Sequence, residues 1–205
     1  NSKTKKWFNK KTEGGEYSPQ KFPTSNDVAA VRLDNDGLQR LYKYDSQTGK
    51  STELIKDLQI AYFAFYNYEK ILATVLDSDK MIDLQSKKTD TLFYNAGRSL
   101  QKVPKTNSMS YSLVNEEGNL DLYLLDMNSY ENFFVTQLPI GIQDYVWIND
   151  TQILVGSGNK LYMYDTLGES EWTRVASLED YGLKNITRMA ISPNGKKLAI
   201  VTESK

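Results

Sequence analysis

The stretch Leu41-Tyr42-Lys43-Tyr44-Asp45 decides the fold of this chain, because a motif of the same kind occurs three more times. The later copies are Lys80-Met81-Ile82-Asp83, Leu122-Tyr123-Leu124-Leu125-Asp126 and Leu161-Tyr162-Met163-Tyr164-Asp165. The final aspartates of the four copies lie 38, 43 and 39 residues apart. A period of about 40 residues built from short alternating strands is typical of a β-propeller, in which each repeat forms one four-stranded sheet, or blade. We therefore predict an all-β fold made of four-stranded antiparallel blades.

The composition of the 205-residue chain fits this fold class. The hydrophobic fraction is 40%, and 14 Tyr, 7 Phe and 3 Trp can supply a packed core. Strands rich in Tyr, Val and Ile, separated by turns rich in Asn, Asp and Gly, are typical of all-β proteins. The 25 basic and 26 acidic residues leave a net charge of -1. Since phosphate-tracking surfaces need clustered Lys and Arg, we expect no nucleic-acid partner.

Two absences restrict the chemistry. The chain has no Cys, so disulfides, thiolate nucleophiles and Cys-ligated metals are excluded. It has no His either, which excludes catalysis by Ser-His-Asp or Cys-His groups and zinc bound by His. No run of about 18 apolar residues is present, so no membrane span is predicted. No signal peptide is visible.

A second repeated feature is a turn that we place between the first two strands of each blade. The strand after each turn is rich in Val, Ile, Leu and Ala, which suits a strand buried between neighbouring blades. Asn and Gly favour such turns because they adopt positive φ at little cost. The five stretches are Phe22 to Val28, Phe65 to Ile71, Val103 to Met109, Trp147 to Ile153 and Ile191 to Leu198.

These two features divide the chain into blades. Four complete blades are predicted at about 16–56, 57–96, 97–138 and 139–184, and the fourth strand of each is expected to be a polar edge. Residues 4–9 read as a lone fourth strand, and residues 185–205 as the first two strands of a further blade. Either the ring has five blades, one of them defective, or the chain is part of a larger ring. We favour the larger ring. Only residues 178–184 are expected to form a short helical turn.

The turn Ser192-Pro193-Asn194-Gly195-Lys196-Lys197 closely resembles the repeat turn of TolB-like β-propellers. Three further stretches are similar to a set of exported TolB-like proteins from Bacteroidetes-type bacteria: Glu13 to Pro19, Gly97 to Leu100 and Gly182 to Arg188. The resemblance covers nearly the whole chain. It implies six blades, export to the periplasm or cell surface, and a role in binding. The stretch Asp83–Lys88 departs from the pattern, because it lacks the turn glycine.

Acidic residues in the turns allow two interpretations. The repeated Asp45, Asp83, Asp126 and Asp165 can form a carboxylate ring or cap their own turns, and we favour capping. The stretch Asp34-Asn35-Asp36-Gly37 resembles the start of a calcium loop, but position 45 is Asp and the flanking segments read as strands. We interpret it as a hairpin turn, with a loose calcium site as the alternative. No metal site, cofactor or catalytic residue is predicted.

The candidate binding surface follows from topology. In a propeller, the connectors that enter each innermost strand gather at one mouth of the central channel, and concave mouths are where ligands bind. Aromatic and Arg side chains there match the composition of binding hot spots. The alternative is that these side chains only cap the channel. The candidate residues are Glu16, Tyr17, Tyr62, Arg98, Asp144, Tyr145 and Arg188. We expect Trp7, Trp147 and Trp172 to pack between blades.

Two classes of function are compatible with these observations. The first is a non-catalytic, exported scaffold that binds a protein, a peptide or a component of the cell envelope at the channel mouth. The second is an enzyme that resembles propeller glycosidases, with Glu16 and Asp144 as a carboxylate pair. Such a pair must converge in a pocket. A third possibility is an accessory propeller that gates a hydrolase domain elsewhere in a larger protein.

Overall fold

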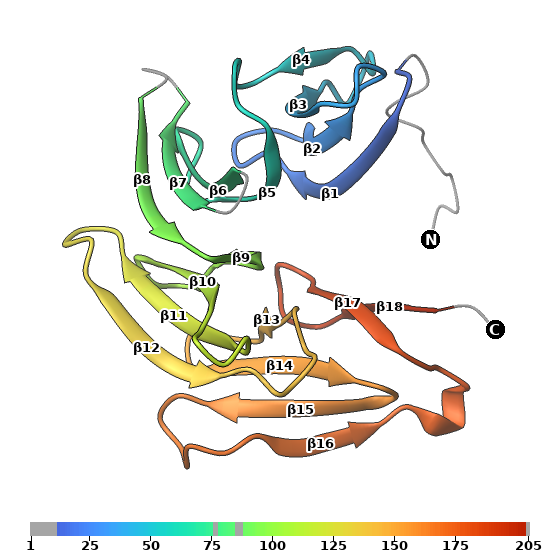
Figure 1. Cartoon of the computed structure of the whole chain (residues 1–205). Coiled ribbons are helices and arrows are strands. Elements are labelled where there is room, and N and C mark those ends of the chain that lie inside the picture. Colours follow the sequence, from blue (N-terminus) through green and yellow to red (C-terminus); the bar gives the residue numbers. More distant parts are fainter. Residues whose placement is uncertain (1–11, 76–77, 85–87, 204–205) are drawn as a thin grey trace. The chain divides into compact units, whose positions relative to one another are not determined.

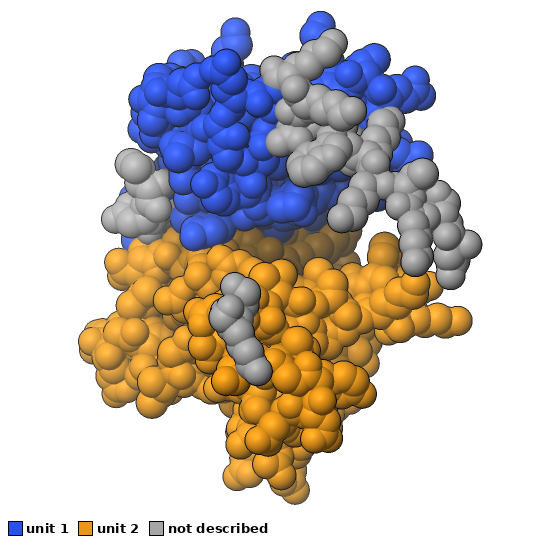
Figure 2. Space-filling model, turned by 90° about the vertical axis from the view of Figure 1, so that its right-hand side faces the viewer, with its two compact units in different colours: residues 1–94 blue, residues 95–205 orange. Residues whose placement is uncertain are grey.

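The computed structural model describes residues 12–75, 78–84 and 88–203, and these residues form antiparallel β-sheets in which the strand order follows the chain (Figure 1). The chain divides into two compact units, residues 1–94 and 95–205, coloured blue and orange in Figure 2. Within the described residues, no helix has the length and apolar character needed to cross a membrane.

Unit 1 contains two four-stranded sheets. The first consists of β1 (Gly15–Lys21), β2 (Val28–Leu33), β3 (Gln39–Tyr44) and β4 (Ser51–Glu53). The second consists of β5 (Ile60–Phe65), β6 (Lys70–Val75), β7 (Ser78–Asp83) and β8 (Thr89–Tyr94).

The core of unit 1 lies between these two sheets and follows from the alternation of side chains along each strand. Ala29 and Val31 point from β2 into the same apolar cluster as Ile71 and Ala73 of β6. Ala30, the residue between the first two, lies in a separate cluster with Tyr42 and Tyr44. β2 is therefore buried on both faces, as predicted for the strand that follows the first turn.

Unit 2 contains two four-stranded sheets and one hairpin. The first sheet consists of β9 (Ala96–Lys102), β10 (Ser108–Val114), β11 (Leu120–Asp126) and β12 (Asn132–Gln137). The second consists of β13 (Val146–Trp147), β14 (Gln152–Ser157), β15 (Lys160–Asp165) and β16 (Thr173–Ser177). The hairpin consists of β17 (Ile186–Ile191) and β18 (Leu198–Thr202).

The second sheet of unit 2 is packed on both sides. Ile153 and Val155 of β14 belong to a cluster with Leu122 of β11, so they face the first sheet. Leu154, between them, belongs to a cluster with Ile186 of β17, so it faces the hairpin. The part of the chain that the structure describes thus forms four four-stranded antiparallel sheets, as expected for an all-β fold of four-stranded blades, and β17 pairs with β18 in a two-stranded sheet. The predicted strand at residues 4–9 lies outside the described residues, as do Trp7 and the turn residues 85–87.

The repeated aspartates whose side chains are described cap their own turns. The Oδ1 atom of Asp45 accepts hydrogen bonds from the backbone N–H groups of Gln47 and Thr48, and Asp126 likewise accepts two in its turn. Asp165 accepts one, from the Leu167 N–H. The N–H of Thr48 makes the largest contribution to lowering the pKa of Asp45. The prediction of turn capping is confirmed for these three residues, and the side chain of Asp83 lies outside the description.

The stretch from Asp34 to Gly37 is a hairpin turn, closed by a bond from the Gly37 N–H to the Asp34 carbonyl with a φ of 81° at the glycine. Both carboxylates are occupied by Arg40, at 2.8 Å from Asp34 and 2.7 Å from Asp36. Hydrogen bonds from Arg40 hold the pKa of Asp36 to about 2. The two carboxylates in the stretch that resembles a calcium loop are therefore neutralised by Arg40 of the neighbouring strand β3.

Three smaller predictions also have counterparts in the structure. A single 3₁₀ turn at Glu179–Tyr181 lies within the predicted helical stretch. The buried Trp147 donates from Nε1 to Ser110 Oγ of the neighbouring sheet at 2.8 Å. Trp172 donates from Nε1 to the Gln137 carbonyl at 3.0 Å. Both described tryptophans therefore link adjacent sheets, as expected.

Candidate functional site

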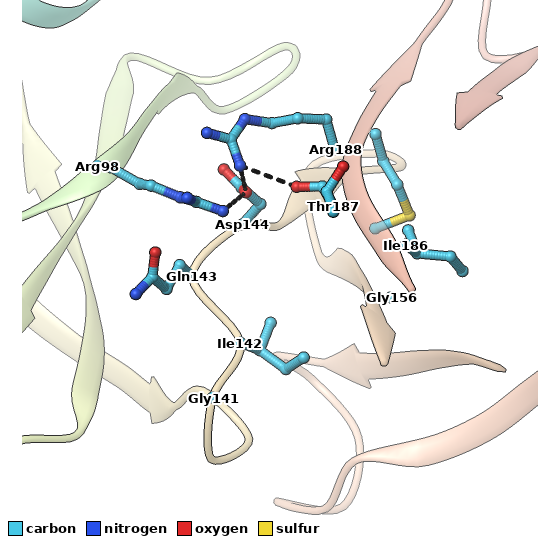
Figure 3. Close-up of a pocket in the computed structure, with 10 residues that line it drawn as sticks. Arg98, Gly141, Ile142, Gln143, Asp144, Gly156, Ile186, Thr187 and Arg188 are labelled. Carbon is cyan, nitrogen blue, oxygen red and sulfur yellow. Dashed lines mark hydrogen bonds and ion pairs between the residues drawn. The ribbon is translucent and has the colours of Figure 1, made fainter. Parts of the chain in front are cut away.

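The candidate site is a pocket of about 310 Å³ in unit 2, and all three of its sheets contribute to it (Figure 3). Its lining includes Arg98 of β9, Ile142 and Asp144 of the β12–β13 connector, Gly156 of β14, and Ile186 and Arg188 of β17. The pocket therefore lies where the first strands of two successive sheets and of the hairpin begin.

Asp144 is the centre of this arrangement. Its Oδ2 atom accepts hydrogen bonds from Nη2 of Arg98, at 2.5 Å, and from Nη1 of Arg188. Its Oδ1 atom accepts a bond from Ser99 Oγ at 3.0 Å. In Figure 3 the two guanidinium groups converge on this carboxylate from different strands, Arg98 from β9 and Arg188 from β17. The Asp144 side chain is 17% exposed, against 29% for Arg98 and 44% for Arg188.

The connector that carries Asp144 is held by hydrogen bonds from the neighbouring sheet. Gln101 of β9 donates from Nε2 to the Tyr145 carbonyl and accepts a 3.4 Å bond from the Trp147 N–H at Oε1. The Tyr145 hydroxyl donates to Ser110 Oγ at 2.9 Å inside the core. Because these bonds hold Tyr145 and Trp147, one and three residues after Asp144, the carboxylate has a defined position at the pocket wall.

The opposite wall is apolar. Ile142, Ile186 and Met189 line it. A Cβ atom placed on the buried Gly156 would overlap Ile186, so only glycine allows β17 to approach β14 this closely. The pocket consequently combines a charged side and an aliphatic side.

One polar atom at the charged side has no partner. Nε of Arg98 is buried without a hydrogen bond among the described residues. An unpaired buried donor normally costs about 1–3 kcal/mol, so natural structures contain few of them.

The predicted site residues fall into three groups. Arg98, Asp144 and Arg188 meet at the pocket. Tyr145 is 1% exposed and its hydroxyl faces the core, so it must be removed from the predicted binding surface. Its neighbour Asp144 lines the pocket.

The remaining three candidates belong to unit 1. Glu16 accepts hydrogen bonds from the hydroxyls of Thr12, at 2.7 Å, and Tyr44, at 3.3 Å. Tyr17 is 52% exposed on β1, and Tyr62 is half-buried on β5. Burial, followed by the charge of Glu16, raises the pKa of Tyr44 to about 12.

Several residues of the site were missed from the sequence. Ser99 directly follows Arg98, and Gly156 interrupts the apolar run of β14, so both carried a weak signal. Gln101 carried a better one, because Gln20 lies two repeats earlier and donates from Nε2 to the Phe63 carbonyl of β5 in the same manner. Ile142 and Ile186 carried no signal, since one lies in an irregular connector and the other in an ordinary strand.

The described lining of this pocket offers two guanidinium groups, one carboxylate and aliphatic side chains. Among the described residues that line the pocket, Asp144 is the one acidic residue. The pocket therefore does not bring together the two carboxylates that a glycosidase uses. Among residues 12–75, 78–84 and 88–203, no group of three acidic side chains is placed to hold a metal ion.

No protein-family model and no curated protein sequence matches this chain. Solved structures do. TolB from Acinetobacter baumannii matches with a TM-score of 0.70 and 16% identity over 90% of this chain. The fold is that of a TolB-like β-propeller. The propeller chain spans about half of that TolB structure, which is covered to 48%.

Two other solved propeller structures are also similar. A structure of a nidogen/laminin complex matches with a TM-score of 0.61 and 14% identity over 80% of this chain and 66% of that one. An oligogalacturonate lyase in complex with manganese matches with a TM-score of 0.60 and 14% identity over 86% of this chain and 58% of that one. At these identities the likeness establishes the fold, and propellers with this fold include both binding proteins and enzymes.

Proposed function

We propose that this propeller is a non-catalytic, exported binding domain that holds a protein, a peptide or a component of the cell envelope at the pocket around Asp144. The observation that carries the proposal is the convergence of Arg98 and Arg188 on one carboxylate beside an open, partly apolar pocket. Pockets that combine apolar walls with a few converging polar groups are the usual sites of ligand binding.

The composition of the site supports binding over catalysis. The chain contains no His and no Cys, and Asp144 is held by three donors from side chains around it. A carboxylate occupied in this way is poorly placed to act as a nucleophile or a base. The residues instead offer charge and hydrogen-bond donors to a partner.

One comparison supports a protein or peptide as the ligand, because the similar structure of a nidogen/laminin complex is an assembly of proteins. Export to the periplasm or cell surface, and a ring of six blades, are what the resemblance to TolB-like proteins implies. Both belong to the proposal.

A carboxylate-based enzyme is the second candidate, and the similarity to the oligogalacturonate lyase favours it. The acid pair that it requires is Glu16 with Asp144, which belong to different units. We rank this candidate lower because the pocket itself supplies one carboxylate.

The proposal is tested by affinity capture from a cell-envelope extract with three forms of the chain. These are the wild type, Arg188→Gln and the matched control Arg174→Gln, which removes the same charge from the exposed strand β16. We expect a specific protein to be retained by the wild type and by the control, and to be lost with Arg188→Gln. Equal retention by all three forms would contradict a binding role for this pocket.

A further inference from the structure

We propose that the group recognised in this pocket is a single carboxylate carried by a peptide, next to a small aliphatic side chain. This inference rests on the proposed function and names the class of its ligand. It follows from the charge balance of the site, from the donors that the two arginines still offer and from the lining of the pocket.

The charge balance favours a monoanion. Two guanidinium groups face one carboxylate, so the cluster carries one uncompensated positive charge when Arg98 and Arg188 are both paired to Asp144. A ligand with one negative charge neutralises the cluster. A dianion such as a phosphate monoester would give the cluster a net negative charge. Its second negative charge would be repelled by the carboxylate of Asp144.

The donor count favours a carboxylate among monoanions. A guanidinium has five N–H donors in a planar fork that matches the two oxygens of a carboxylate. The described bonds to Asp144 use one nitrogen of Arg98, Nη2, and one of Arg188, Nη1. Both arginines therefore retain donors on other nitrogen atoms.

The unpaired Nε of Arg98 indicates where the ligand binds. Nε and Nη2 lie on the same edge of the guanidinium, and this edge can hold both oxygens of one carboxylate. Because Nε is buried while the whole side chain is 29% exposed, a rotation of the group is needed to present the edge to the pocket. Binding then satisfies a donor that otherwise has no acceptor.

The other side of the pocket selects the neighbouring part of the ligand. Ile142, Ile186 and Met189 provide an aliphatic wall. A volume of about 310 Å³ is near the lower limit for small-ligand pockets, which suits one side chain and one carboxylate. Two sources provide this chemistry: the free C-terminus of a peptide that ends in a residue such as Leu, and a Glu or Asp side chain beside such a residue.

Isothermal titration with the whole chain and three synthetic peptides distinguishes the sources. The peptides are N-acetyl-Ala-Ala-Leu with a free carboxylate, the same peptide as its C-terminal amide, and the amide of N-acetyl-Ala-Glu-Leu. We expect the first, the third or both to bind and the neutral amide not to bind. Binding of the first alone assigns the pocket to C-termini, and binding of the third alone to acidic side chains. Binding of the neutral amide with equal affinity, or of none of the three peptides, would overturn the inference.

Variants test the roles of the charges. Arg188→Gln should weaken binding of the charged peptide at least tenfold, while Arg174→Gln should leave the affinity unchanged. Asp144→Asn should tighten binding several-fold, because the ligand no longer competes with an internal carboxylate for the arginines. Weaker binding by Asp144→Asn, in a protein whose unfolding transition is cooperative, would contradict that competition. If the capture experiment succeeds but no carboxylate peptide binds, the binding function stands and only the ligand class is rejected.

Discussion

Gly156 and Ile186 approach each other so closely that a Cβ atom on the glycine would lie 2.8 Å from the Cβ of Ile186 and closer still to its Cγ2. The contact joins β14 to β17, where the hairpin packs against the last four-stranded sheet. Both residues also line the pocket. This packing therefore sets the position of Arg188, two residues after Ile186, relative to Asp144.

Gly156→Ala should destabilise unit 2 by about 1–3 kcal/mol, because the added methyl group overpacks a buried contact. Denaturation followed by tryptophan fluorescence reports on this, since two of the three tryptophans, Trp147 and Trp172, lie in unit 2. Adding Ile186→Ala removes the overlapping Cγ2 and should recover part of the loss. A double variant as unstable as the sum of the two single variants would show that this contact is not the cause.

Two buried serines on β10 should respond in opposite ways to the same substitution. Ser110 Oγ accepts hydrogen bonds from the Tyr145 hydroxyl and from Nε1 of Trp147. Ser110→Ala leaves two buried donors without this acceptor and should cost about 1–3 kcal/mol. Urea denaturation measures the loss.

Ser112 is the matched control for that substitution. It is as buried as Ser110, but its Oγ atom has no partner among the described residues. Ser112→Ala removes an unsatisfied polar atom and should leave the stability unchanged or raise it. Equal losses at both serines would mean that packing around β10, and not hydrogen bonding, determines the effect.

Asp27 should make unit 1 sensitive to acid. The Ser46 N–H, then Ser25 and Lys43, hold the pKa of this carboxyl to about 2. A folded-state pKa below the unfolded value stabilises the fold at pH values above the unfolded pKa of about 4, and that stability is lost as the pH falls towards 2. Asp27→Asn should therefore be less stable than the wild type at pH 7 and show a shallower loss below pH 4. Circular dichroism during urea denaturation checks this, with the exposed Asp90→Asn as the control.

The glutamines that bridge neighbouring sheets should matter equally in both units. Gln101 bonds to the backbone of Tyr145 and Trp147, and Gln20 to the backbone of Phe63. Replacing either by Leu leaves backbone groups unpaired, at an expected cost of about 1–3 kcal/mol. Gln101→Leu should lower the midpoint of the fluorescence transition. Gln20→Leu should lower the midpoint followed by circular dichroism by a similar amount, and a loss at only one of the two positions would contradict equal roles for the two glutamines.

Much of the fold was predictable because it is periodic. The motif that ends in Asp45 predicts the third strand and its capped turn. The apolar run after the first turn predicts the buried second strand. Local hydrogen bonding and alternation determine both features, so they are visible in a short stretch of sequence.

The site was predictable only in part. That Arg98, Asp144 and Arg188 lie together could be expected, because topology places the starts of first strands near one another. Tyr145 was assigned to the surface because a candidate position does not show which way its side chain points. The contact between Gly156 and Ile186 joins residues from different sheets, and the local sequence pattern of neither strand predicts it.

The carboxylate of Asp144 is also a mechanical link, since it ties the β12–β13 connector to the sheet that begins at β9 and to the hairpin that begins at β17. A partner that draws Arg188 away loosens the hairpin's attachment at that point. If the pocket binds a partner as proposed and Arg188 leaves Asp144, β17 should become more mobile, and faster amide exchange in this strand would report the binding.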